Sequence, residues 1–138
     1  MQHLVPFAAV RYLWAAPVTL AGVVVAGLAR LGGGRVAWRD GVLEAWGGPL
    51  SPLLRHGNPL LPIAAITLGH VVLARREEDL VRTRRHERVH VRQYERWGPC
   101  FPMLYLGASL VAWLGGGDAY RDNRFEREAR AGDSTDAA

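Results

Sequence analysis

An uncharged run near the N-terminus places the strongest limit on how this chain can fold. The run extends for eighteen residues, from Tyr12 to Ala29, and is bounded by Arg11 and Arg30. As a helix it would be about 27 Å long, close to the roughly 30 Å thickness of the hydrocarbon core of a bilayer. We interpret residues 1–31 as a membrane-anchor segment. Two alternatives remain open: a helix that is buried in protein or lies at an interface, and a cleaved signal peptide.

The arginines around this run indicate which side of a membrane the rest of the chain would occupy. Arg30, Arg35 and Arg39 follow the run, whereas Arg11 precedes it. This bias favours the cytoplasmic side for the remainder of the chain. All 17 basic residues are arginine, and many of them alternate with acidic residues, which is typical of a solvated surface. We therefore expect a membrane partner and no nucleic-acid partner.

The residues after Gly32 predict a small sheet. The strand-like segments 35–39 and 42–46 flank Asp40-Gly41, which is a strong signal for a two-residue hairpin turn. Residues 47–62 are rich in Gly and Pro and predict a loop, and residues 63–73 predict a third strand with Gly69 as a bulge. In the hairpin register, four side chains share the face that we expect to be buried: Val36, Trp38, Leu43 and Ala45.

Three helices are expected after the third strand. The first runs from about Leu80 to Trp97 and is ended by Gly98-Pro99. The second, from about Pro102 to Leu114, is apolar on all sides, which indicates burial in protein or in lipid. The third begins near Asp122. We therefore predict an α+β fold with a short antiparallel sheet, in which residues 32–131 form the domain and residues 132–138 a disordered tail.

An H-E-x-x-H string on the first of these helices carries the chemistry. His86 and His90 are four residues apart, so they project from one helix face and can share one zinc ion. Glu87 stands beside the first histidine, where its carboxylate can accept a proton from a water held by the metal. A catalytic zinc also requires a third protein ligand, for which Glu126 and Glu128 are the downstream candidates.

The order of these motifs resembles the gluzincin class of zinc metallopeptidases, in which a second helix with E-x-x-A or E-x-x-D follows H-E-x-x-H. Glu126 and Ala129 match that second motif, and the match implies that Glu126 is the third zinc ligand. Residues 67–72 and 86–93 are similar to small bacterial zincin domains, which carry T-x-G-x-x-I/V on a strand ahead of H-E-x-x-H-x-x-Q. The resemblance covers about half the chain, over residues 63–129.

This resemblance implies hydrolysis of a peptide or protein substrate, with zinc as cofactor and Glu87 as general base. It also implies that residues 66–72 form an edge strand that lines the substrate cleft. His70 and Tyr120 are then candidates to stabilise an oxyanion, although each also has a structural explanation, as a strand residue or a half-buried ring. Gln93 is expected to pack in the core or to orient a ligand imidazole.

Arg88 departs from the family pattern, because peptidases with this motif usually have uncharged residues between Glu and the second His. Helix geometry should direct Arg88 away from the metal face. Two alternatives therefore stay open: a catalytically inactive, membrane-associated zincin-like module, and a membrane protein whose H-E-x-x-H string is accidental. Cys100 is the only cysteine, which rules out an intrachain disulfide and a four-cysteine zinc site.

Overall fold

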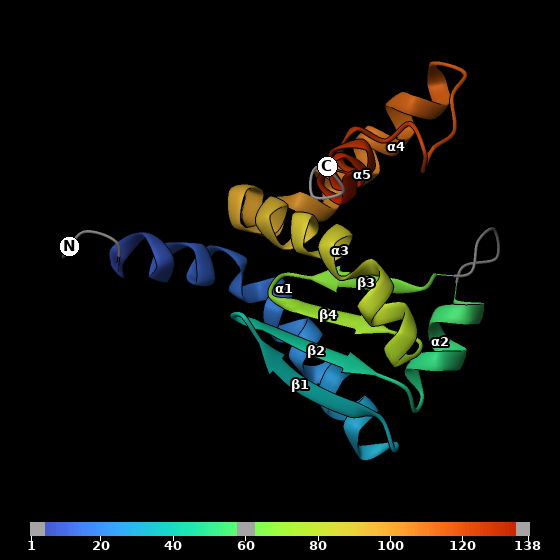
Figure 1. Cartoon of the computed structure of the whole chain (residues 1–138). Coiled ribbons are helices and arrows are strands. Elements are labelled where there is room, and N and C mark those ends of the chain that lie inside the picture. Colours follow the sequence, from blue (N-terminus) through green and yellow to red (C-terminus); the bar gives the residue numbers. More distant parts are fainter. Residues whose placement is uncertain (1–4, 58–62, 135–138) are drawn as a thin grey trace.

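The chain forms three layers, with one long helix on each face of a small sheet. The computed structural model describes residues 5–57 and 63–134 of the 138-residue chain. Helix α1 (Val5–Leu31) lies behind the four-stranded sheet and α3 (Glu77–Trp97) lies in front of it (Figure 1). Beyond α3, helices α4 (Phe101–Leu114) and α5 (Arg124–Ser134) lie on the side away from the sheet (Figure 1). The α+β class is therefore confirmed.

The sheet is mixed, and the predicted purely antiparallel sheet is wrong. Strands β1 (Arg35–Arg39) and β2 (Val42–Trp46) form the expected hairpin, in which Arg39 pairs with Val42 across the turn. Strands β3 (Ala65–Leu68) and β4 (Val71–Ala74) form a second antiparallel hairpin. The strand order is β1-β2-β4-β3, so the two hairpins meet through their inner strands, and β2 and β4 run parallel.

The predicted third strand is divided into two strands by a turn at Gly69 and His70. Gly69 has a φ of 61°, a left-handed conformation that glycine adopts without strain, so it reverses the chain where we expected a bulge. The turn also packs closely on α1, since a Cβ atom at Gly69 would lie 2.8 Å from the backbone nitrogen of Thr19. Local sequence signals did not distinguish one long strand from two short ones.

The predicted loop over residues 47–62 contains a short helix, α2 (Leu50–His56). Its side chains Leu50 and Leu54 are buried in a cluster with Val71, Leu73 and the alanines of α1. Burial of these leucines against other elements therefore stabilises a helix in spite of the turn-forming residues around it. Residues 58–62 of the predicted loop lie outside the described residues.

The hairpin face that we expected to be buried is covered only in part. Ala45 is fully buried, but Val36 and Trp38 are 37% and 66% exposed. They lie on β1, which is an edge strand of the sheet. The opposite face of β2 is buried instead, with Val42 and Glu44 under α3.

Helix α1 approaches the sheet through a stripe of small residues. Gly22, Ala26 and Ala29 are buried, and a Cβ atom at Gly22 would lie 2.8 Å from the Cβ of Val71. Over residues 9–31, most of the remaining circumference of α1 is apolar and exposed. By length and composition, Ala9–Leu31 and Glu77–Leu114 are each long and apolar enough to cross a membrane.

The last three helices follow the predicted order with shifted ends. Helix α3 begins at Glu77, three residues before the predicted start, because Asp79 in its first turn pairs with neighbouring arginines. It ends at Gly98, as expected. Helix α5 begins after Asn123, whose Oδ1 accepts a hydrogen bond from the backbone of Phe125 at 2.9 Å. It reaches Ser134, inside the predicted tail, and residues 135–138 lie outside the described part of the chain.

Candidate metal centre

Three side chains from two helices converge in the space between α3 and α5. His86 Nε2 and His90 Nε2 are 3.2 Å apart on α3. Glu126 of α5 places Oε2 3.0 Å from His86 Nε2 and Oε1 3.2 Å from His90 Nε2. The structure therefore brings together the three residues named from the sequence, in a group that could hold a metal ion.

The geometry and the donor set of this group are suited to zinc. Tetrahedral zinc with bonds of about 2.0–2.1 Å places neighbouring ligand atoms about 3.3 Å apart, close to the separations found here. Oε2 of Glu126 is buried and lies 3.0 Å from His86 Nε2, but this contact lacks the geometry of a hydrogen bond, so the oxygen has no hydrogen bond in the described residues. A buried carboxylate oxygen without a hydrogen bond is costly, and a cation among the three side chains would offset that cost. Two imidazoles and one carboxylate also leave a fourth position open, as in catalytic zinc sites.

Gln93 orients the ring of His90. Its Nε2 donates to the carbonyl oxygen of Phe125 at 3.1 Å and to Glu128 at 3.0 Å, so its Oε1 must be the atom that faces His90. Because Oε1 can only accept, His90 Nδ1 carries the hydrogen in this 2.7 Å contact. The Nε2 atom of His90 is thereby directed toward Glu126, which is the role expected of a residue that orients a ligand imidazole.

The site attracts positive charge. Burial opposes ionisation of Glu126, but the adjacent imidazoles of His86 and His90 outweigh it and hold the pKa of Glu126 well below its usual range. Burial alone would lower the pKa of both histidines, yet the neighbouring carboxylates of Glu126 and Glu87 raise each pKa above its ordinary value. The two carboxylates thus favour a cation at the imidazole nitrogens.

Glu87 is buried beside this group and is held by the sheet. Its Oε2 accepts a hydrogen bond of 2.6 Å from Thr67 Oγ1 on β3. Burial raises the pKa of Glu87, although His90 and the hydrogen bond from Thr67 oppose this shift. Thr67 belongs to the strand motif noted in the sequence, but that motif gave no indication that its hydroxyl would hold Glu87.

Two tyrosines lie beside Glu126. Tyr105 of α4 donates to Glu126 Oε1 at 2.7 Å, a contact that the sequence did not suggest because Tyr105 stands in an apolar run. Tyr120 is 43% exposed, and partial burial together with the charge of Glu126 raises its pKa to about 12. Tyr120 therefore lies close to the metal ligands, and its role in stabilising an oxyanion stays a prediction.

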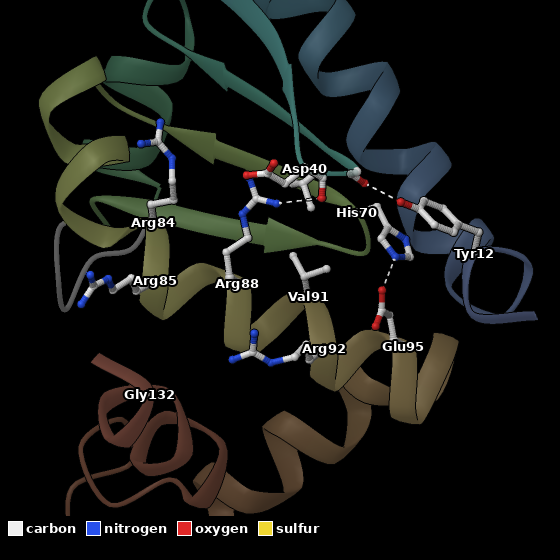
Figure 2. A pocket seen from close by; sticks show the side chains of 12 residues that line it. Tyr12, Asp40, His70, Arg84, Arg85, Arg88, Val91, Arg92, Glu95 and Gly132 are labelled. Carbon is white, nitrogen blue, oxygen red and sulfur yellow. Dashed lines mark hydrogen bonds and ion pairs between the residues drawn. The ribbon is translucent and has the colours of Figure 1, made fainter. Parts of the chain in front are cut away.

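His70 lies in a different environment. Its Nε2 is 2.9 Å from Glu95 Oε1, and its ring stacks on Tyr12 with a centroid separation of 4.0 Å (Figure 2). No contact in residues 5–57 and 63–134 joins His70 to the metal-binding group. The proposed oxyanion role of His70 stays a prediction that these contacts do not support.

Arg88 points away from the metal-binding group, as the helix geometry predicted. Its Nη2 donates to Glu44 Oε1 at 3.0 Å and to the carbonyl of Arg39 at 2.9 Å. Glu128, the other candidate third ligand, contacts Gln93 and Arg96 instead of the histidines. Asp133 of α5, which the sequence did not single out, lies 3.4 Å from His86 Nδ1.

Comparisons with protein-family models, with curated proteins and with solved structures gave no significant match to this chain. The resemblance to zincins therefore rests on the motifs and on the arrangement of the residues described above.

Proposed function

We propose that this chain is a zinc-dependent peptidase of the zincin type that acts at a membrane. The observation that carries the proposal is the convergence of His86, His90 and Glu126, with the buried carboxylate of Glu87 beside them. When bound by these residues, zinc supplies the Lewis acidity that makes water a nucleophile near neutral pH.

Glu87 is the proposed general base. Thr67 occupies its Oε2 atom, so Oε1 is the atom that would accept a proton from the attacking water. A base is most effective when its pKa is close to the working pH, and burial shifts the pKa of Glu87 in that direction. Tyr105 restrains Glu126 by its hydrogen bond to Oε1 and so helps to fix the third ligand.

The edge of the sheet supports a peptide as the substrate. Strand β3 is an edge strand and pairs only with β4 among the described strands. Its Thr67 contacts Glu87, so the free edge of β3 lies next to the proposed base. An extended peptide that paired with this edge would be held by backbone hydrogen bonds with its chain alongside the metal centre.

Membrane association is proposed from the apolar surfaces of α1 and α4. Leu13, Leu20 and Leu28 of α1 are more than half exposed, as are Met103 and Trp113 of α4. Exposed apolar surfaces of this extent are unusual in a soluble monomer and are typical of contact with lipid or a partner. The cytoplasmic location stays a prediction from the arginines that follow the N-terminal run.

The central test separates metal binding from hydrolysis. Glu87→Gln should retain stoichiometric zinc, measured by elemental analysis of the purified chain, and should lose peptide hydrolysis. His86→Ala should lose both. Unchanged hydrolysis in Glu87→Gln would remove Glu87 from the mechanism. Zinc binding without hydrolysis in the unaltered chain would favour the inactive zincin-like module.

A further inference from the structure

A groove lies on the side of α3 that faces away from the metal centre. Residues on a helix advance by about 100° each, so Arg88 and His90 are directed to nearly opposite sides. The groove has a volume of about 430 Å³ and is bordered by α3, by the turn between β1 and β2, and by Tyr12 of α1 (Figure 2). Its lining includes four arginines and two carboxylates: Arg84, Arg85, Arg88, Arg92, Asp40 and Glu95.

Two of these arginines are held in place by a buried carboxylate of the sheet. The buried carboxylate of Glu44 accepts two hydrogen bonds from Arg84, at 3.0 and 3.1 Å, and one from Arg88, at 3.0 Å. A guanidinium has five N–H donors, and Arg84 uses two of them on Glu44, which leaves three for a further acceptor. Arg88 also donates to the backbone carbonyls of Arg39 and Asp40, which leaves two. Glu44 therefore fixes the positions of the two guanidinium groups without using all of their hydrogen-bonding capacity.

Arg92 adds a cation that has no partner among the described residues. It lies one helical turn after Arg88 and is exposed. No hydrogen bond or ion pair of Arg92 is present within the described part of the chain. An anion in the groove would therefore gain the charge of Arg92 without first breaking an existing ion pair, and it would meet donors that Glu44 has already positioned.

The groove borders the apolar surface of α1. Tyr12 lines the groove, and its hydroxyl donates to the carbonyl of Gly41 at 2.8 Å. Leu13 and Leu20, which follow on the outer side of the same helix, are 73% and 64% exposed. A site for an anion and a surface for hydrocarbon thus lie side by side. Anionic phospholipids combine these two chemistries in one molecule.

We infer that this arginine groove binds the phosphate headgroup of an anionic phospholipid, whose acyl chains lie against the outer face of α1. Arginine is well suited to the role because its planar N–H pairs match phosphate oxygens. The inference rests on the proposed membrane association and is independent of the proposed metal chemistry. It gives the domain a defined orientation on the membrane, with the metal centre on the other side of α3.

Binding of the full chain to vesicles tests the inference. Partitioning is measured with phosphatidylcholine vesicles and with vesicles that also contain phosphatidylglycerol, at one ionic strength. Arg92→Gln should weaken binding to the anionic vesicles roughly fivefold and leave binding to neutral vesicles unchanged. Arg96→Gln is the matched control, because Arg96 lies on the same helix, is also exposed and does not line the groove. It should cause a much smaller loss.

Three results would overturn the inference. Equal losses in the two variants would indicate diffuse surface charge, and equal binding of the unaltered chain to both vesicle types would show that headgroup charge is not recognised. The third result is a protein that is stabilised by free glycerol phosphate and shows no preference for anionic vesicles. That result would indicate that the groove binds a soluble phosphate ester. Failure to bind either vesicle would contradict the proposed membrane association, whereas the zinc content of the same sample tests the metal centre separately.

Discussion

Helix α3 faces a buried carboxylate on each of its two sides, and the two carboxylates differ in their partners. Glu44 of the sheet is 1% exposed and meets the guanidinium groups of Arg84 and Arg88. Glu126 of α5 is 3% exposed and meets the imidazoles of His86 and His90. Burial and charge are therefore nearly the same on the two sides, and the chemistry of the neighbours is different.

This difference distinguishes a structural ion pair from a candidate binding site. Arginine stays protonated at any ordinary pH, and both oxygens of Glu44 have arginine partners, so this carboxylate is satisfied within the protein. An imidazole nitrogen can instead bind a metal when it is not protonated, and one oxygen of Glu126 has no hydrogen bond among the described residues. A buried carboxylate that has titratable neighbours and an oxygen without a hydrogen bond is the better indication of a ligand site.

The largest expected effect follows from removal of the third ligand. Glu126→Ala should weaken zinc binding on the order of several hundredfold, if each of four ligands provides about a quarter of the 10–16 kcal/mol typical of zinc sites. Competition with a chromophoric chelator measures this affinity. Glu128→Gln, on the same helix, is the control and should retain zinc. Comparable losses in the two variants would contradict the assignment of Glu126.

A substitution at Glu44 should change the stability of the protein and leave its affinity for zinc unchanged. Glu44→Ala leaves two guanidinium groups without their carboxylate and should lower the free energy of unfolding by about 3 kcal/mol. Chemical denaturation measures this change, with Glu78→Ala, an exposed substitution in α3, as the reference. Zinc affinity of the folded Glu44→Ala protein should be unchanged. A change in stability no larger than that of the reference would show that Glu44 does not anchor α3.

Gln93 tests whether the orientation of the imidazole matters for the metal site. Gln93→Ala removes the acceptor that fixes His90 Nδ1–H, and zinc affinity should fall by roughly tenfold or more, as for other partners of ligand histidines. Thermal unfolding of the same variant reports how much of the effect is loss of packing. If the affinity for zinc is unchanged while the protein is destabilised, Gln93 has only a packing role.

The smallest expected effect concerns the contact between the sheet and the proposed base. Thr67→Val keeps the shape of the side chain and removes the hydroxyl that donates to Glu87. Zinc content should stay the same, and kcat for peptide hydrolysis should fall by roughly tenfold, because a hydrogen bond to a charged group contributes about 1.5–3 kcal/mol. A variant with unaltered kcat would show that Glu87 does not depend on Thr67 for its position.

The sequence predicted the site more completely than the fold, for a physical reason. The relative position of the His86 and His90 side chains is set by the pitch of one helix, so four-residue spacing alone brings them together. Glu126 was predicted from a motif on a second helix, and its contact with the histidines is seen in the structure. Tyr105 and Asp133 could not be predicted, since their positions depend on how α4 and α5 pack against α3.

Dependence on contacts between distant parts of the chain also explains the errors in the predicted sheet. Asp40-Gly41 specifies a turn between neighbouring residues, and the hairpin around it is confirmed. The parallel pairing of β2 with β4 joins residues far apart in the chain and leaves no local signal. The short helix α2 likewise depends on the burial of Leu50 and Leu54 against elements before and after it in the sequence.

The position of Glu126 on the last described helix has a consequence for synthesis of the protein. A ribosome adds residues from the N-terminus, so His86 and His90 emerge well before the carboxylate that completes their group. Until α5 has been made and has packed on α3, the two histidines lack their third partner. The candidate metal centre can therefore assemble only after nearly all of the described chain has been translated and folded. If the chain is the proposed peptidase, this order would keep it inactive while its own nascent chain is still exposed.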